Sequence, residues 1–246
     1  TSEGTVAPGT RGLLLKGNIT ANDDINITGK ATLLNLWDIS LTDVIMTSSN
    51  GNINFTTGNV NGQFVSIGTN VFNASNDINI YANRYSSFNS GTSTFNTNKK
   101  VSFLSNSTST GFTRDFNTDG FIFDSGITNL VIGDNTNTSN INLDKAISIS
   151  GDIEINGNNI AINNSLTATN TGTIKLKANT NITDGASGYV VADSLLLLDG
   201  AVTLDNALND VGTIAASGID SLLYSDKNDL EITTLDTTDG ITSIGA

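Results

Sequence analysis

The stretch of this chain best suited to chemistry is "RDFNTDGFIFD", residues 114–124. Acidic and amide residues alternate in it, a glycine follows them, and a further aspartate closes it. Calcium takes about six to eight oxygen ligands, and a loop supplies them when alternate side chains point one way and a glycine lets the chain turn. The sequence therefore predicts Ca2+ as its one candidate cofactor, with these metal ligands: Asp115, Asn117, Asp119 and Asp124.

This segment departs from a helix-loop-helix calcium site at its end. Gly126 stands at the twelfth position, where such loops carry a bidentate Glu, and no flanking helix is expected. Asp124 would have to replace that Glu. The alternative is a solvated acidic turn between two strands, in a chain rich in Asn and Asp, and both interpretations stay open.

The composition excludes several classes of function. The chain has 246 residues, a net charge of −13, no Cys and no His. Disulfides, thiolate nucleophiles and most zinc sites are excluded, and so is the usual general base. An acidic chain repels phosphate backbones, so we expect no nucleic-acid partner. No catalytic residue is predicted and the chain is expected not to be an enzyme, although an Asp pair on adjacent coils could still form.

Membrane insertion is not expected either. The longest apolar run, "SLLLLDG" at 194–200, is far shorter than the roughly 20 residues of a membrane span. The first ten residues, "TSEGTVAPGT", show no basic region followed by an apolar run, so no signal peptide is recognised in this chain. A segment that has already been removed could still have directed export.

Short segments with two apolar residues at i and i+2 recur along the chain, which is the period of a half-buried strand. These segments are "DINITG" from Asp24, "NINFTTG" from Asn52, "DINIYA" from Asp77, "NINLD" from Asn140, "DIEING" from Asp152, "TIKLKA" from Thr173 and "DLEITT" from Asp229. Turn signals such as Asn50-Gly51, Asn61-Gly62 and Asn156-Gly157 lie between or within them. The chain is therefore predicted to be all-β.

A sandwich or barrel would also explain this rhythm, but the spacings favour a solenoid. Ile153, Ile174 and Leu195 follow one another at intervals of 21 residues, about one turn of a parallel β-helix. Stacked coils would place Asn over Asn and Ile over Ile, so that side-chain amides bond along the stack. All ten Phe lie between Phe55 and Phe123, which predicts a wider or differently filled middle section, or an excursion from the helix.

The prediction is a single domain over residues 1–246, a right-handed parallel β-helix and a fragment of a longer solenoid, with a loop excursion near 105–126. With coils of roughly 20–25 residues it would have about a dozen coils and a length of about 55–60 Å. Neither end reads as a polar cap, so we expect further chain or further copies to stack there.

Residues 194–246 resemble a repeat of the filamentous haemagglutinin-like large exoproteins. The matching features are a leucine run, a Thr-Leu strand, an Asn-Asp-Val coil, a Leu-Tyr coil and a Gly-Ile strand; here they are Leu195–Leu198, Thr203-Leu204, Asn209–Ala216, Leu222–Tyr224 and Gly240-Ile241. The resemblance covers about 53 residues. It implies a right-handed β-helix, secretion with the help of a partner protein, and an extracellular or bacterial cell-surface location.

The resulting functional expectation is a structural stalk or fibre-forming segment of a secreted adhesin. Its receptor would be a glycan or protein on a host or neighbouring cell. The alternative is a carbohydrate-active β-helix enzyme, a polysaccharide lyase or hydrolase, which would line one groove with carboxylates and a Lys or Arg. Glycosylation sequons begin at Asn18, Asn26, Asn54, Asn73, Asn106, Asn137, Asn163 and Asn181, and unmodified Asn is the preferred interpretation.

Overall fold

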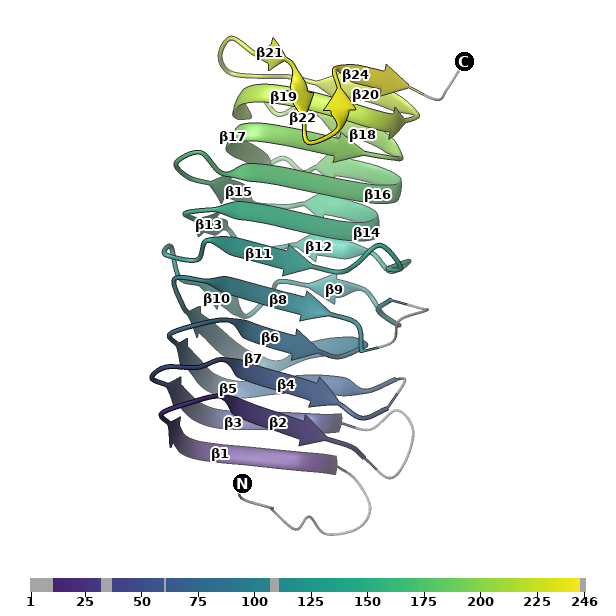
Figure 1. The fold of residues 1–246 in the computed structure, drawn as a ribbon. Coiled ribbons are helices and arrows are strands. Elements are labelled where there is room, and N and C mark those ends of the chain that lie inside the picture. Colours follow the sequence, from purple (N-terminus) through teal and green to yellow (C-terminus); the bar gives the residue numbers. More distant parts are fainter. Residues whose placement is uncertain (1–10, 32–36, 60, 107–110, 244–246) are drawn as a thin grey trace.

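The protein is a parallel β-solenoid of about nine turns, and the residues that the structure describes are 65% strand and include no helix. The computed structural model describes residues 11–31, 37–59, 61–106 and 111–243. In Figure 1 the coils lie one above another in a single continuous stack from the N-terminal to the C-terminal end. The all-β class and the solenoid architecture expected from the sequence are confirmed.

Three columns of parallel strands form the walls of the solenoid. The first column has strands in every coil: β2 (Ile25–Gly29), β4 (Ile53–Thr57), β6 (Ile78–Tyr81), β8 (Lys100–Leu104), β11 (Asn129–Ile132), parts of β14 (Asp152–Ile162), β16 (Thr173–Asp184), β17 (Tyr189–Leu198) and β19 (Asp210–Ile219), and finally β21 (Glu231–Ile232) and β24 (Ile241–Ser243). We call this column the first wall.

The other two walls change their construction along the axis. In the N-terminal half, long strands bend to serve both: β1 (Arg11–Ala21), β3 (Trp37–Ser48), β5 (Gln63–Ala74) and β7 (Arg84–Asn96), which β10 (Phe121–Phe123) continues. In the C-terminal half they are built by shorter strands with parts of β14, β16, β17 and β19: β9 (Phe116–Asn117), β12 (Ile141–Leu143), β18 (Ala201–Leu204), β20 (Ser221–Tyr224), β13 (Ile147–Ile149) and β15 (Ser165–Ala168). The antiparallel hairpin β22 (Thr234–Leu235) and β23 (Thr238–Asp239) is the one exception to parallel pairing among the described strands.

The apolar residues at i and i+2 of the first wall form two rows inside the solenoid. One row is Ile25, Ile53, Ile78, Val101, Leu130, Ile153, Ile174, Leu195, Ile214 and Ile232. The other is Ile27, Phe55, Ile80, Phe103, Ile132, Ile155, Leu176, Leu197, Ala216 and Ile241. Each row continues through every turn without a polar interruption, so one apolar core extends through the whole stack.

The expected number of coils was too high. Ile25 pairs with Ile53, whereas Ile153 pairs with Ile174, so the N-terminal coil contains more residues than the C-terminal one. The dozen coils followed from applying the shorter C-terminal interval to the whole chain. With about nine turns and a strand spacing of about 4.8 Å, the stack is about 43 Å long rather than about 55–60 Å.

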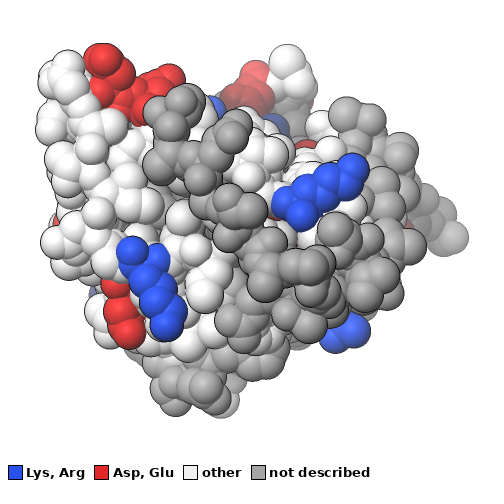
Figure 2. Space-filling view, turned by 90° about the horizontal axis from the view of Figure 1, so that it is seen from below, with Lys and Arg blue, Asp and Glu red and all other residues white. Residues whose placement is uncertain are grey.

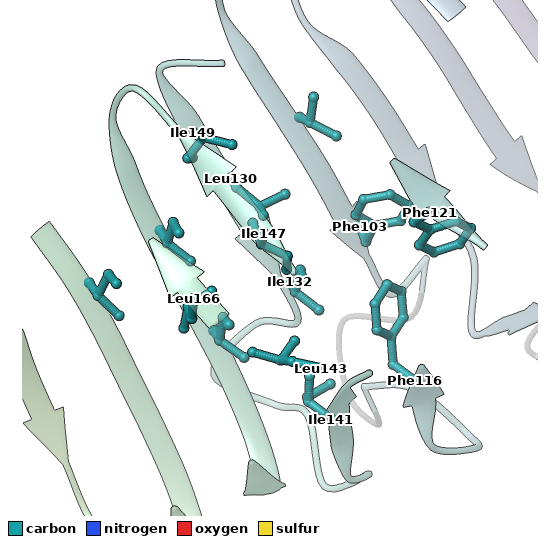
Figure 3. Close-up of a cluster of buried hydrophobic side chains, with 14 of the residues drawn as sticks. Phe103, Phe116, Phe121, Leu130, Ile132, Ile141, Leu143, Ile147, Ile149 and Leu166 are labelled. Carbon is teal, nitrogen blue, oxygen red and sulfur yellow. The ribbon is translucent and has the colours of Figure 1, made fainter. Parts of the chain in front are cut away.

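Aromatic side chains fill the middle of the solenoid, as the clustering of Phe predicted. Phe103 lies at the centre, with ring centroids 5.1 Å from Phe121, 5.3 Å from Phe95 and 5.3 Å from Phe116. Figure 3 shows the rings of Phe103, Phe116 and Phe121 beside aliphatic side chains such as Ile132 from the next turn. The longer N-terminal coils therefore enclose larger side chains, because close packing matches a coil's perimeter to its contents.

The turn signals are confirmed at two positions and take another form at the third. Asn50-Gly51 lies between β3 and β4, and Asn61-Gly62 lies between β4 and β5. Asn156-Gly157 lies inside β14, where the register against β16 shifts between Gly157 and Asn159. The corner is thus a bulge within a continuous strand, which bends the strand without ending it.

The predicted loop excursion falls partly outside the described residues, which omit 107–110. At its start, the Asn106 side-chain amide donates to the Thr57 Oγ1 at 3.0 Å and to the Asn59 carbonyl at 3.2 Å. Thr57 ends β4, two coils below β8. The chain directly after β8 therefore contacts an earlier coil.

Candidate functional site

The predicted calcium segment forms two short strands at a corner of the solenoid. Phe116 in β9 and Phe121 in β10 are buried, and Gly120 between them has a φ of +81°. The turn expected at this glycine is therefore confirmed. Because side chains alternate along a strand, the polar residues on either side of Phe116 point away from the core.

Asp115 and Asn117 are members of hydrogen-bonded ladders that join neighbouring coils. The Asn140 amide donates to the Asp115 Oδ2 at 3.2 Å. The Asn142 amide donates to the Asn117 Oδ1 at 2.6 Å. Two residues of an extended strand advance by about 6.6 Å, so these side chains are spread along the wall rather than directed at one point.

The other two predicted ligands also have separate partners. The Lys145 Nζ lies 3.6 Å from the Asp119 Oδ1, in an exposed ion pair. The Asp124 Oδ1 accepts a hydrogen bond of 2.8 Å from the Gly126 backbone N–H, which closes the turn after β10. Among the residues that the structure describes, no group of three or more acidic side chains comes together. Calcium binding here stays a prediction, and it requires the segment to rearrange.

Calorimetric titration tests that prediction. Binding should release heat and raise the melting temperature at millimolar Ca2+, because the ion would bind only the folded chain. The matched variant Asp119→Asn should remove both effects. If the wild-type chain shows neither effect, the segment is a corner of the solenoid and no metal site.

Polar ladders along the outside are the most regular feature of the surface. The Asn54 amide donates to Asn26 at 2.8 Å, the Asn79 amide donates to Asn54 at 3.0 Å, and the Ser102 hydroxyl donates to Asn79 at 2.7 Å. A second ladder joins Asp115, Asn140, Asn159 and Asn181 across later turns. The expected bonding of amides along the stack is confirmed. These outer polar side chains therefore hydrogen-bond to the neighbouring coils and help to hold the stack together.

Buried amides satisfy the backbone where the chain turns a corner. Asn209, which is fully buried, accepts a 2.7 Å hydrogen bond from the Val190 N–H and donates to the Leu204 and Ser225 carbonyls at 3.1 and 3.2 Å. Asn70 has the same role in β5: it accepts a 3.0 Å hydrogen bond from the Val44 N–H and donates to the Ile67 carbonyl at 3.1 Å. The sequence did not single out these two residues, because Asn is so frequent here that a buried one carries no local signal.

Asp38 is a buried carboxylate with a structural role. It is fully buried and accepts hydrogen bonds from the Ala31 N–H, the Asn59 N–H and the Asn59 amide at 3.0, 3.0 and 2.8 Å. Three donors satisfy the carboxylate that burial would otherwise penalise. Both oxygens of the Asp38 carboxylate therefore accept hydrogen bonds from Ala31 or Asn59.

Two tyrosines have strongly perturbed ionisation. Burial raises the pKa of Tyr85 well above its usual value, and the hydroxyl donates toward the Ile80 and Leu104 carbonyls at 2.8 and 2.9 Å. Burial and the neighbouring Asp226 carboxylate raise the pKa of Tyr224, whose hydroxyl donates to that carboxylate at 2.7 Å. A phenol that stays protonated is a structural donor and cannot serve as a base at neutral pH.

Five ion pairs lie on the surface that the structure describes, and each joins one lysine to one carboxylate. The pairs are Lys100–Asp77, Lys145–Asp119, Lys175–Glu154, Lys177–Asp199 and Lys227–Asp210, at 3.3–3.8 Å. A polysaccharide lyase or hydrolase would need several carboxylates and a cation directed at one bound sugar chain. Among the described residues, no group of three or more acidic side chains comes together in this way.

The comparisons with known proteins give no relative. No family model, no curated protein and no solved structure matches this chain. The resemblance of residues 194–246 to exoprotein repeats therefore stays a prediction. The described residues also include no helix with the length and hydropathy to span a bilayer.

The structure separates the glycosylation sequons by accessibility. Asn137 is 3% exposed, and its amide donates to the Asn156 carbonyl at 2.8 Å, so a folded chain cannot accept a glycan there. Asn26 and Asn54 are engaged with each other in a ladder. Side-chain hydrogen bonds also engage the sequon residues Asn73, Asn106, Asn163 and Asn181. These contacts favour unmodified Asn at seven of the eight positions.

Proposed function

We propose that this chain is a structural stalk or fibre-forming segment of a secreted cell-surface adhesin, located outside the cell or on a bacterial surface. The observation that carries the proposal is the pair of apolar rows that continue through every turn of the first wall. Such a stack has no domain boundary at which to bend. Each coil contacts only its neighbours, so its length scales with the number of coils.

The outer surface supports the same role. Amide ladders and single ion pairs cover the walls, and they stabilise the stack instead of presenting converging reactive groups. We propose accordingly that the chain is not an enzyme and that a cell-surface glycan or protein is recognised by loops at the corners. The acidic net charge of −13 argues against nucleic acid and anionic lipid as partners.

Removal of one coil tests the stalk directly. Deleting residues 153–173 should join two equivalent positions of the wall, since Ile153 pairs with Ile174. The shortened chain should fold cooperatively and resist trypsin as the complete chain does, because the remaining coils restack in register. A chain that no longer folds after this deletion would show that the coils are not interchangeable units.

An assay for products released from polysaccharides distinguishes the stalk role from the enzymatic alternative. The purified chain, incubated with a panel of acidic and neutral polysaccharides, should generate neither new reducing ends nor the absorbance of unsaturated uronates. Accumulation of either product in proportion to protein concentration would establish a carbohydrate-active enzyme. A matched sample of the coil-deleted variant controls for contaminating activity.

A further inference from the structure

A row of outward side chains stands on the five-stranded sheet β1-β3-β5-β7-β10. Its members pair from strand to strand in successive coils: Ile45, Val71, Thr94 and Ile122. Each of them is next to a buried core residue of its own strand: Met46, Phe72, Phe95 and Phe121. Because side chains alternate along a strand, the four members point away from the core. We call them the outer row.

The outer row is apolar at its exposed positions. Ile45 and Ile122 are 44% and 49% exposed, and Val71 and Thr94 between them are half-buried. β3, β5 and β7 are paired on both sides, and β10 contacts both β7 and β13. In Figure 1 β3, β5, β7 and β10 lie within the stack and not at either end of it. The exposure of the row therefore does not depend on where the chain begins or ends.

The surroundings of the outer row are neutral. Two residues further along the strands, Thr47, Asn73 and Asn96 form a second outward row. The Asn73 amide donates to the Thr47 Oγ1 at 3.3 Å, and the Asn96 amide donates to the Asn73 Oδ1 at 2.8 Å. None of the seven residues in the two rows carries a charge. In Figure 2, the view along the stack from its N-terminal end, much of the described surface is likewise uncharged.

Outward apolar residues of the first wall are covered by the chain itself. Leu196 and Ala215, which pair with each other, are 2% and 0% exposed. The hairpin β22–β23 lies against β19, the strand of Ala215, and in Figure 1 it crosses in front of the stack. The same outward row of the first wall also includes the charged residue Lys175. The outer row of the five-stranded sheet differs because its two isoleucines stay uncovered.

A second copy of this chain is the partner that the charges favour. With a net charge of −13, two copies repel each other wherever acidic surfaces meet, whereas a neutral face lets them approach. Asp43 lies two residues before Ile45, and Asp124 lies two residues after Ile122, on the opposite side of the row. If a twofold axis runs along the outer row, each of its residues faces its own copy and neither carboxylate does.

The size of the contact predicts a weak dimer. Five strands spaced by about 4.8 Å, each contributing about five residues at about 3.3 Å, present roughly 400 Å² per copy. Two such faces bury roughly 800 Å², and a stable dimer needs about 1,200–2,000 Å². Uncharged outward residues also pair with one another in β13, β15 and β17, namely Ser148, Thr167 and Val191, and they can extend the contact. Pairing should therefore be reversible and depend on protein concentration.

We propose that two copies of this chain pair side by side through the outer row, with their stacks parallel. Ile45 and Ile122 of one copy then pack against the same residues of the other, and their exposed apolar surface is removed from water. Such a lateral contact leaves both ends of each stack free of the interface. The inference deepens the fibre-forming role by naming a second copy as the partner, and it rests on that role.

Sedimentation velocity at increasing protein concentration tests the pairing with the complete chain. The wild-type chain should shift reversibly from monomer to dimer, and rising salt should strengthen the dimer because it screens the repulsion between acidic copies. Ile45→Lys and Ile122→Lys should each weaken the dimer at least about tenfold, since each new lysine would face its own copy. The matched control Leu208→Lys makes the same change of charge at a 55% exposed leucine between β18 and β19, and it should pair as the wild type does.

A cysteine placed in the outer row tests the arrangement of the two copies. The chain has no native Cys, so Thr94→Cys should form a disulfide-linked dimer on mild oxidation, because each Thr94 would face its own copy. The matched variant Thr203→Cys, at a half-buried outward threonine of β18, should stay monomeric under the same conditions. Circular dichroism and the melting temperature should show that every variant remains folded, as expected for outward positions.

The proposal is overturned if the chain is monomeric at every concentration, or if Ile45→Lys and the Leu208→Lys control pair equally well. It is also overturned if a neutral polysaccharide retards the wild-type chain in native gels and Ile45→Lys removes the retardation, because the row would then bind a glycan. These results leave the stalk role intact, since the deletion of residues 153–173 tests that role with the outer row unchanged.

Discussion

The N-terminal and C-terminal halves of the solenoid use one architecture with two kinds of interior. Buried rings such as Phe55, Phe64 and Phe72 fill the first half, where the paired residues Ile53 and Ile78 enclose a long coil. Aliphatic side chains fill the second, where the paired residues Leu195 and Ile214 enclose a much shorter one. Strand pairing gives each coil the same rise in both halves, while the buried side chains and the number of residues per coil differ from coil to coil.

The largest difference between the halves should appear when an aromatic side chain is removed. Phe103→Ala deletes a fully buried ring that packs against several other rings, and it should lower the free energy of unfolding by about 3–5 kcal/mol. Ile155→Val, in the same row of the aliphatic half, should cost about 0.5–1.5 kcal/mol. Urea denaturation followed by circular dichroism measures both. Similar values for the two variants would remove the distinction between the interiors.

The buried corner amides should matter equally in both halves. Asn209→Ala leaves the Val190 N–H and two carbonyls without their partner, and Asn70→Ala leaves the Val44 N–H. Each should lower the free energy of unfolding by about 1–3 kcal/mol, the usual cost of an unsatisfied buried group. A large effect in only one half would show that the corners are not equivalent. The same denaturation experiment provides the values.

Alkaline pH should act on the aromatic half through Tyr85. Because burial raises the pKa of this phenol in the folded chain, its contribution to stability is complete below about pH 10, the pKa of the unfolded chain. That contribution is lost as the pH rises toward the folded value. Tyr85→Phe should cost about 1 kcal/mol at neutral pH and flatten the decline above about pH 10. An unchanged decline in this variant would assign the effect to other groups, with Tyr224 next to test.

The outer ladders should contribute least. Asn54→Ala removes the bonds to Asn26 and Asn79 at a partly exposed position, and it should lower the free energy of unfolding by about 0.5–1 kcal/mol. Ala161 occupies the wall of the C-terminal half without a side-chain ladder of its own, so Ala161→Asn is the reciprocal variant. It should be neutral or slightly stabilising in thermal unfolding. A loss for Asn54→Ala as large as that for a buried corner amide would make the ladders primary determinants of the fold.

Much of this fold could be predicted from local pattern. The alternation in "DINITG" and "DIEING" identified β2 and β14, and repeated motifs indicated stacking. The number of coils could not be predicted, because the interval between stacked residues varies along the chain and nothing in the sequence marks a coil boundary. Ile25 pairs with Ile53, Ile78 with Val101 and Ile153 with Ile174. At the candidate calcium segment the alternation was correct, but the carboxylates face different neighbours. The hydrogen-bonding or ion-pair partner of an outward side chain depends on which residue the next coil places beside it. A local motif does not specify that residue.

Distances between spin labels along one wall test the central claim most directly, because the chain has no native Cys. Asn26 and Lys175 occupy the same outward row of the first wall, six coils apart through Asn54, Asn79, Ser102, Val131 and Glu154. Labels at Asn26→Cys and Lys175→Cys should give a narrow distribution near about 29 Å, six steps of about 4.8 Å. Labels at Asn54→Cys and Glu154→Cys should give about 19 Å, four steps. Broad distributions, or two distances that do not differ by about two coil spacings, would contradict an in-register parallel solenoid.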